Sequence, residues 1–110
     1  MSATLDFDTG PLNWVRGDIE AALKGAAERV RAYGTDQSLE NALRLARDEV
    51  HGATGALRMV GLEGAAKVIS ALEDVLTSMD SKAIPADELN SKAVLDALEA
   101  LLKWVVRMAE

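Results

Sequence analysis

The stretch HGATGALRMVGL (residues 51–62) contains the single histidine of the chain and three of its eight glycines. The surrounding residues otherwise favour a strong helix, and a glycine inside a helix costs about 1 kcal/mol relative to alanine. Helix stability therefore does not explain why Gly55 follows His51 by one helical turn. The spacing indicates that this side of the helix has another role.

Apolar residues around this stretch recur in steps of four and three. The series is Leu39, Leu43, Ala46, Val50, Ala53, Leu57 and Val60. This period is typical of a helix that buries one side in a bundle. We expect the helix to begin near Asp36 or Ser38, since both residues are suitable N-caps. A tight reversal is predicted between Gly61 and Gly64.

The same periodicity predicts three further helices. The first covers residues 11–33, with a proline in its first turn and Gly34 as a C-terminal stop. The third follows the reversal and reaches about residue 79. The fourth begins at Pro85 and still continues at residue 110. Four amphipathic helices with short connections predict an all-α fold, an antiparallel up-and-down four-helix bundle.

The predicted domain organisation is simple. Residues 11–110 form one bundle, and the polar residues 1–10 form a flexible N-terminal arm. A length of 110 residues fits a single domain. Because the fourth helical pattern runs to the last residue, we expect the domain to be part of a longer protein.

Composition excludes several classes of function. The net charge of −6, from 18 acidic and 12 basic residues, argues against nucleic acid or an anionic membrane as a partner. No apolar run reaches the ~18–20 residues of a membrane span, and the N-terminus lacks the pattern of a signal peptide. The absence of cysteine suits a reducing compartment. We therefore expect a cytoplasmic location.

His51 is predicted to lie on the exposed side of the second helix. At about 100° per residue it is about 100° away from Val50 of the buried seam. The residues that share its side, within about 60°, include Arg44, Arg47, Thr54, Gly55 and Arg58. Gly55 leaves room for another protein to approach the imidazole. The arginines offer positive charge where a phosphate would sit.

Glu73 is the predicted partner of His51 on the third helix. His51 lies ten residues before Gly61, and Glu73 lies eleven residues after Leu62. In an antiparallel helix pair these near-equal separations bring the two side chains to the same height. A carboxylate at this place can accept the imidazole N–H and leave the other ring nitrogen basic.

The same residues also have plainer interpretations. A lone exposed histidine on a bundle is commonly ordinary surface, and arginines on a helix commonly pair with neighbouring acids. Gly55 can also mark a close helix crossing. The sequence shows no nucleophile triad, Gly-rich phosphate loop or metal-ligand cluster. We therefore expect no independent enzyme activity, no metal and no cofactor.

Together these residues resemble the histidine-phosphotransfer (HPt) domain. That family has a histidine, a lysine three residues later, a glycine after four and often a glycine after ten, on the second helix of a four-helix bundle. His51, Gly55 and Gly61 match three of these positions. In the version found in chemotaxis-type histidine kinases, a glutamate follows the histidine by twenty-two residues, and Glu73, within LEDVL, occupies that position.

A closer resemblance covers residues 11–78. The stretches LNWVRGDIEAALKGA and HGATGALRMVGLEGAA are similar to the N-terminal domain of the large chemosensory hybrid kinases that control type IV pili. The resemblance implies that His51 is the phosphoacceptor and that Glu73 orients its ring. The residues implied to contact phosphate or a partner are Thr54, Gly55, Arg44, Arg47 and Arg58.

The implied partners are a kinase catalytic domain and the receiver domain of a response regulator. The domain itself would be a phosphocarrier rather than an enzyme. One position departs from the family pattern, because Thr54 replaces the lysine and supplies no charge. Either Arg47 or Arg58 compensates for the lysine, or the chain is a degenerate HPt bundle that serves only for docking or dimerisation.

Overall fold

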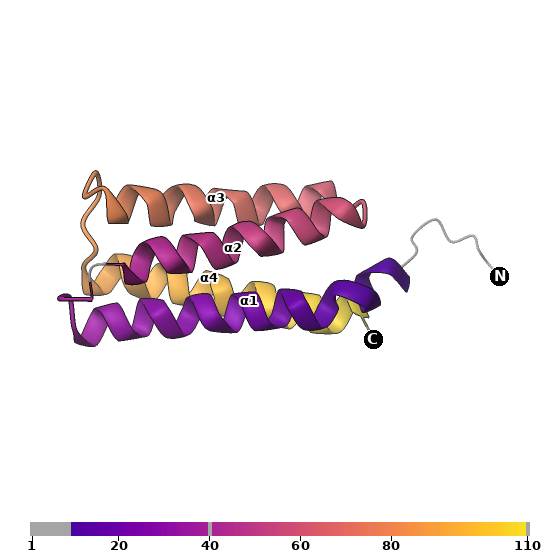
Figure 1. Cartoon of the computed structure of the whole chain (residues 1–110), viewed down its shortest axis with the longest axis horizontal. Helices are drawn as coiled ribbons and strands as arrows, with labels where there is room; N and C mark the ends of the chain where they lie inside the picture. Colours follow the sequence, from indigo (N-terminus) through magenta and orange to yellow (C-terminus); the bar gives the residue numbers. More distant parts are fainter. Residues whose placement is uncertain (1–9, 40, 110) are drawn as a thin grey trace.

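The computed structural model of the protein describes residues 10–39 and 41–109. Over these residues it contains four helices and no strand. The helices are α1 (Gly10–Thr35), α2 (Ala42–Met59), α3 (Glu63–Asp80) and α4 (Glu88–Ala109). Successive helices run in opposite directions and are joined by short connections (Figure 1). The predicted all-α, up-and-down four-helix bundle is therefore confirmed.

All four helices contribute to the core. The largest fully buried side chains are those of Ile19, Leu23, Leu43, Leu57, Ile69, Leu76, Met79, Leu98, Val30, Val50 and Val105. On α2 the buried residues include Leu43, Ala46, Val50, Ala53 and Leu57, which are the central members of the predicted seam. Each fully buried aliphatic side chain contributes about 1.5–3 kcal/mol through burial. This shared seam determines which side of α2 remains exposed.

The predicted beginning of α2 is wrong. The helix begins at Ala42, and Leu39 is 43% exposed rather than part of the seam. The carboxylate of Asp36 accepts hydrogen bonds from the backbone N–H of Ser38 (3.0 Å) and from its hydroxyl (2.5 Å). These bonds hold the pKa of Asp36 below its ordinary value. Both candidate N-caps therefore form a local turn instead of a helix cap.

The predicted beginning of α4 at Pro85 is also wrong. The helix begins at Glu88, and the Asp87 carboxylate accepts a hydrogen bond of 2.9 Å from the backbone N–H of Asn90. This bond, to the third residue of the helix, is the N-cap pattern. At the other end of the chain α1 begins at Gly10, the last residue of the predicted arm. Residues 1–9, the rest of that arm, lie outside the described residues.

Gly61 produces the reversal between α2 and α3. Its φ angle is +83°, a conformation that glycine adopts without steric cost. The N–H of Leu62 donates to the carbonyl of Leu57 (2.9 Å), and the N–H of Gly61 donates to that of Arg58 (3.0 Å). This pair of bonds is a Schellman motif, which closes the end of a helix. The predicted tight reversal is confirmed, and it fixes the register of α3 against α2.

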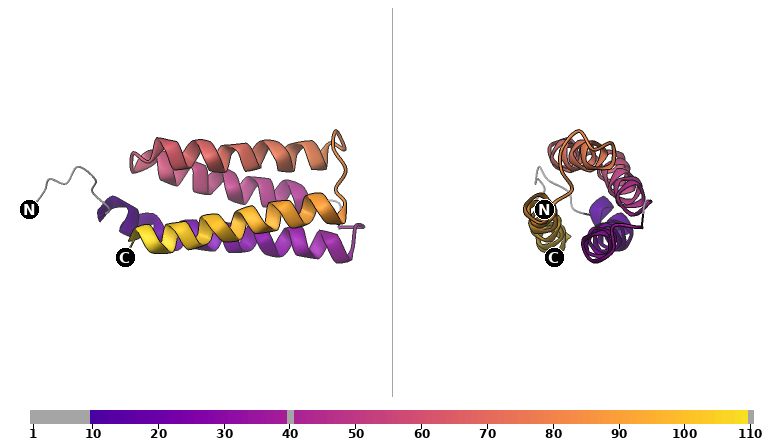
Figure 2. Two further views of the ribbon diagram at one scale, coloured as in Figure 1. Left: turned by 180° about the vertical axis from the view of Figure 1, so that it is seen from behind. Right: turned by 90° about the vertical axis from the view of Figure 1, so that its left-hand side faces the viewer.

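The helices are not evenly packed around the core. α1 packs against α2 and α4, and α2 packs against α3, whereas α3 and α4 scarcely touch. The end-on view in Figure 2 shows this open arrangement. A groove of about 610 Å³ lies between α3 and α4. It is lined by Gly64, Ala65, Val68, Ala71, Leu72, Val75, Ala97, Ala100, Leu101 and Trp104.

The end of α3 yields a prediction about stability. Lys82 follows α3 with a φ of 65° and donates its N–H to Met79, while Ala83 donates to Ser78, so the Schellman motif recurs without glycine. Lys82→Gly is expected to raise the free energy of unfolding by about 0.5–1 kcal/mol. The relieved strain of about 1–2 kcal/mol exceeds the entropy that glycine adds to the unfolded chain, about 0.4–1 kcal/mol. Urea denaturation measures the change.

Gly61→Ala is the matched control for this substitution. It places a Cβ at the equivalent position after α2 and is expected to lower the free energy of unfolding. If Lys82→Gly lowered stability as well, the strain assigned to Lys82 would be contradicted.

Candidate functional site

His51 lies near the middle of α2, and its side chain is 73% exposed. The predicted exposure is therefore confirmed. A Cβ placed on either nearby glycine, Gly52 or Gly55, would meet no atom of another helix within 4 Å. Gly55 consequently does not mark a close helix crossing, and that alternative interpretation is wrong. The two glycines leave open surface beside the imidazole on which another molecule can approach.

Glu73 extends from α3 and contacts the His51 ring. The distance from Glu73 Oε1 to His51 Nδ1 is 2.7 Å, so the predicted contact is confirmed. The Glu73 side chain is only 15% exposed. An ionised carboxylate accepts hydrogen bonds but cannot donate them, so this contact places the proton on Nδ1. The lone pair of the neutral ring then lies on Nε2.

Thr54 is buried, contrary to prediction, with 1% of its surface exposed. Its Oγ1 donates to Glu73 Oε2 at 2.7 Å and lies 3.1 Å from the carbonyl oxygen of Val50. Thr54 sits about 60° around the helix from His51, on the side that faces α3. The hydroxyl therefore bonds to Glu73 and does not face solvent. The predicted contact of Thr54 with a phosphate stays a prediction.

His51, Glu73 and Thr54 thus form a short hydrogen-bonded chain between α2 and α3. One carboxylate oxygen accepts from the imidazole and the other accepts from the hydroxyl. Hydrogen bonds to a charged carboxylate are stronger than bonds between neutral groups. These hydrogen bonds connect the buried hydroxyl of Thr54 to the exposed ring of His51. This arrangement holds one nitrogen of the ring and leaves the other facing solvent.

The three arginines of the predicted contact surface have polar partners close in sequence. Arg44 donates to the side-chain oxygen of Asn41 (2.9 Å), Arg47 pairs with Asp48 (2.9 Å), and Arg58 lies 3.8 Å from Glu63, the first residue of α3. The contacts of Arg47 and Arg58 agree with the plainer interpretation of the arginines as ion-pair partners, whereas the partner of Arg44 is a neutral amide. Exposed pairs of this kind contribute about 0–1 kcal/mol. They can therefore exchange for a charged ligand at little cost.

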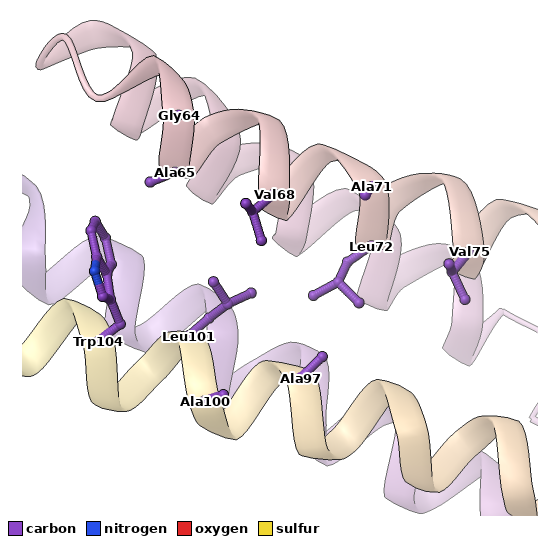
Figure 3. A pocket seen from close by; sticks show the side chains of 10 residues that line it. All are labelled: Gly64, Ala65, Val68, Ala71, Leu72, Val75, Ala97, Ala100, Leu101 and Trp104. Carbon is purple, nitrogen blue, oxygen red and sulfur yellow. The ribbon is translucent and has the colours of Figure 1, made fainter.

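The groove between α3 and α4 offers a surface of a different kind. Figure 3 shows Val68 and Leu72 of α3 opposite Leu101 and Trp104 of α4. All the lining residues are apolar or small, so the groove presents no group for acid–base or nucleophilic chemistry. His51 is not among them. The candidate site therefore lies on the surface of the α2–α3 pair.

The described residues contain no group of three or more His, Cys, Asp or Glu side chains placed to hold a metal ion. None of their helices is long and apolar enough to cross a membrane.

Comparison of the chain with models of known protein families, with curated proteins and with solved structures finds no match.

The hydrogen bond from His51 to Glu73 predicts the tautomer of the histidine. When the imidazole is neutral, it should be protonated mainly on Nδ1, and Glu73→Ala should return it to the tautomer mixture of a free imidazole. The ¹⁵N chemical shifts of the ring measure the two populations. Asp74→Ala is the matched control, because it removes the same charge from the neighbouring exposed residue. An equal change in both variants would contradict a direct contact.

Proposed function

We propose that the chain is a histidine-phosphotransfer domain of a chemosensory two-component kinase. In this proposal His51 accepts a phosphoryl group and passes it to an aspartate of a receiver domain. The observation that carries the proposal is the exposed imidazole whose Nδ1 is held by Glu73 at 2.7 Å. A ring held in this way presents Nε2 as a nucleophile. The link to kinases that control type IV pili rests on the sequence resemblance alone.

The chemistry needs no further group from this chain. The Nε2 lone pair attacks the γ-phosphorus of ATP held by the kinase, a nitrogen–phosphorus bond forms, and ADP leaves with the electrons of the broken phosphorus–oxygen bond. The ring becomes cationic, and the Glu73 carboxylate stabilises it through the Nδ1 proton. An aspartate of the receiver then attacks the phosphorus. The nitrogen–phosphorus bond breaks, and Nε2 recovers its lone pair.

The surroundings of His51 suit an approach by two successive partners. Gly52 and Gly55 are exposed and have open space where a side chain would be. Arg44 and Arg58 are exposed on the same helix, and their weak pairs can rearrange toward acidic groups of a kinase or receiver. A kinase and a receiver of this class act in the cytoplasm, so the proposal includes a cytoplasmic location.

A second candidate function is docking or dimerisation without phosphorylation. It is favoured by the buried hydroxyl of Thr54, because the resemblance expects a lysine there that helps to hold the phosphoryl group. In this case the exposed arginines bind a partner and His51 has no chemical role. Partner binding should then weaken as salt concentration rises, since exposed charges are screened.

The deciding experiment uses radiolabelled ATP. Kinase catalytic domains and receiver domains of the same organism, expressed separately, are incubated with the wild-type chain and with His51→Gln. We expect acid-labile label on the wild type, transfer of that label to a receiver, and no label on His51→Gln. The exposed substitution should change the free energy of unfolding by less than about 0.5 kcal/mol, so loss of label cannot reflect unfolding.

Two outcomes would count against phosphotransfer. Label at a residue other than His51 would contradict both candidate functions. An unlabelled wild-type chain that binds a partner in a salt-dependent manner would favour docking. In that case Arg44→Gln and Arg58→Gln should weaken binding, whereas His51→Gln should leave it unchanged.

A further inference from the structure

The hydroxyl of Thr54 is buried and takes no direct part in the proposed transfer. It has a single proton to donate and two acceptors within reach, Glu73 Oε2 at 2.7 Å and the carbonyl oxygen of Val50 at 3.1 Å. The carboxylate is both closer and charged, so it is the stronger acceptor. The other oxygen of the same carboxylate holds Nδ1 of His51 at 2.7 Å.

We propose that Thr54 is a positioning residue that acts through Glu73 on His51. The buried hydroxyl fixes the orientation of the carboxylate, and the carboxylate in turn fixes the imidazole with Nδ1 protonated and Nε2 directed outward. Its effect on phosphoryl transfer rests on the proposed function. Its effect on the imidazole does not, because the tautomer exists whether or not a kinase acts on the chain.

The need for such a residue follows from the side chains involved. Glu73 has a flexible side chain, and the imidazole that it holds is 73% exposed. A single hydrogen bond to an exposed ring leaves the Glu73 side chain with rotamer freedom, because ordering a long side chain costs conformational entropy. Thr54 is 1% exposed and β-branched, so its hydroxyl is confined to few rotamers. Thr54 therefore supplies the rigid end of the hydrogen-bonded series that runs through Glu73 to His51.

A hydroxyl also differs from an ammonium group at this position. A lysine beside Glu73 would neutralise the carboxylate, whereas threonine donates one hydrogen bond and leaves the negative charge in place. The full charge of Glu73 then acts on the imidazole. This is the charge that stabilises the cationic ring after Nε2 has formed a bond to phosphorus.

Thr54 also has a purely structural interpretation. A threonine inside a helix commonly donates to the carbonyl four residues earlier, and here that carbonyl belongs to Val50. In that case removal of the hydroxyl would alter helix packing without affecting the ring. The two interpretations differ in what the imidazole does, and that difference is measurable.

The test compares Thr54→Val, which removes the hydroxyl at nearly constant shape, with Thr54→Ser, which keeps it. Potassium phosphoramidate serves as the phosphoryl donor: its phosphorus–nitrogen bond breaks, ammonia leaves, and a bond forms at Nε2 of His51. The ¹⁵N shifts of the ring give the tautomer, and ³¹P NMR gives the rate. We expect Thr54→Val to lower the Nδ1–H population and to slow phosphorylation about three- to tenfold, as for the loss of one ordinary hydrogen bond. Thr54→Ser should stay close to the wild type.

A double-variant comparison separates an effect that passes through Glu73 from a general effect of the substitution on folding. In a Glu73→Ala background, Thr54→Val should produce no additional change in tautomer or rate, because the hydroxyl acts only through the carboxylate. Thr54→Ala provides the same comparison if Thr54→Val does not fold. The proposal is overturned if removal of the hydroxyl leaves both the tautomer population and the phosphorylation rate at wild-type values. It is also overturned if the effect of Thr54→Val persists without Glu73, or if Thr54→Ser behaves like Thr54→Val. A wild type that no kinase labels would overturn the proposed function instead, and the tautomer results would still stand.

Discussion

The reversal at Gly61 is the constraint on which the candidate site depends. His51 and Glu73 are twenty-two residues apart in sequence and lie on different helices, so only the register between α2 and α3 brings them together. A slip of one residue would move Glu73 by about 1.5 Å along the helix and turn it by about 100° around the axis. A hydrogen bond tolerates only a few tenths of an ångström. The positive φ of Gly61 and the two bonds that close α2 remove that freedom.

The α2 helix combines three environments within one turn. Val50 and Ala53 belong to the core, His51 faces solvent, and Thr54 lies at the boundary that α3 covers. A chemically useful exposed side chain is normally disordered, because nothing restricts its rotamers. Here the boundary position solves this difficulty: a residue buried under α3 can reach a carboxylate that is itself partly shielded. The site is thus exposed at its reactive end and anchored at its other end.

Much of the fold and part of the site could be predicted because periodicity is a local property of the sequence. The spacing of Val50, Ala53 and Leu57 indicated the buried seam of α2, and near-equal separations from the reversal at Gly61 and Leu62 placed Glu73 opposite His51. The beginnings of α2 and α4 were misplaced because Asp36 and Asp87 offer their carboxylates to nearby N–H groups, and a pattern of apolar residues contains no information about such bonds.

The burial of Thr54 could not be predicted for a different reason. A helical wheel gives the angle between Thr54 and His51, but whether a residue at that angle is exposed depends on which neighbouring helix covers it. The groove between α3 and α4 has the same origin. Each helix shows an apolar stripe in sequence, yet the stripe does not reveal that α3 packs on α2 and stays apart from α4. Pairwise packing is a property of the assembled bundle, and local patterns do not contain it.

The charge balance around His51 bears on how a phosphoryl group would be held. A phosphoryl group brings two negative charges to a chain whose net charge is already −6, and the Glu73 carboxylate can stabilise only the ring, through its Nδ1 proton. Positive charge must therefore come from elsewhere on α2. Arg47 and Arg58 pair with Asp48 and Glu63 through exposed contacts, and Arg44 contacts only the neutral amide of Asn41. Because exposed contacts of this kind contribute about 0–1 kcal/mol, these arginines can turn toward a phosphate. On the proposed function, they would supply the charge that Thr54, in place of the family lysine, does not.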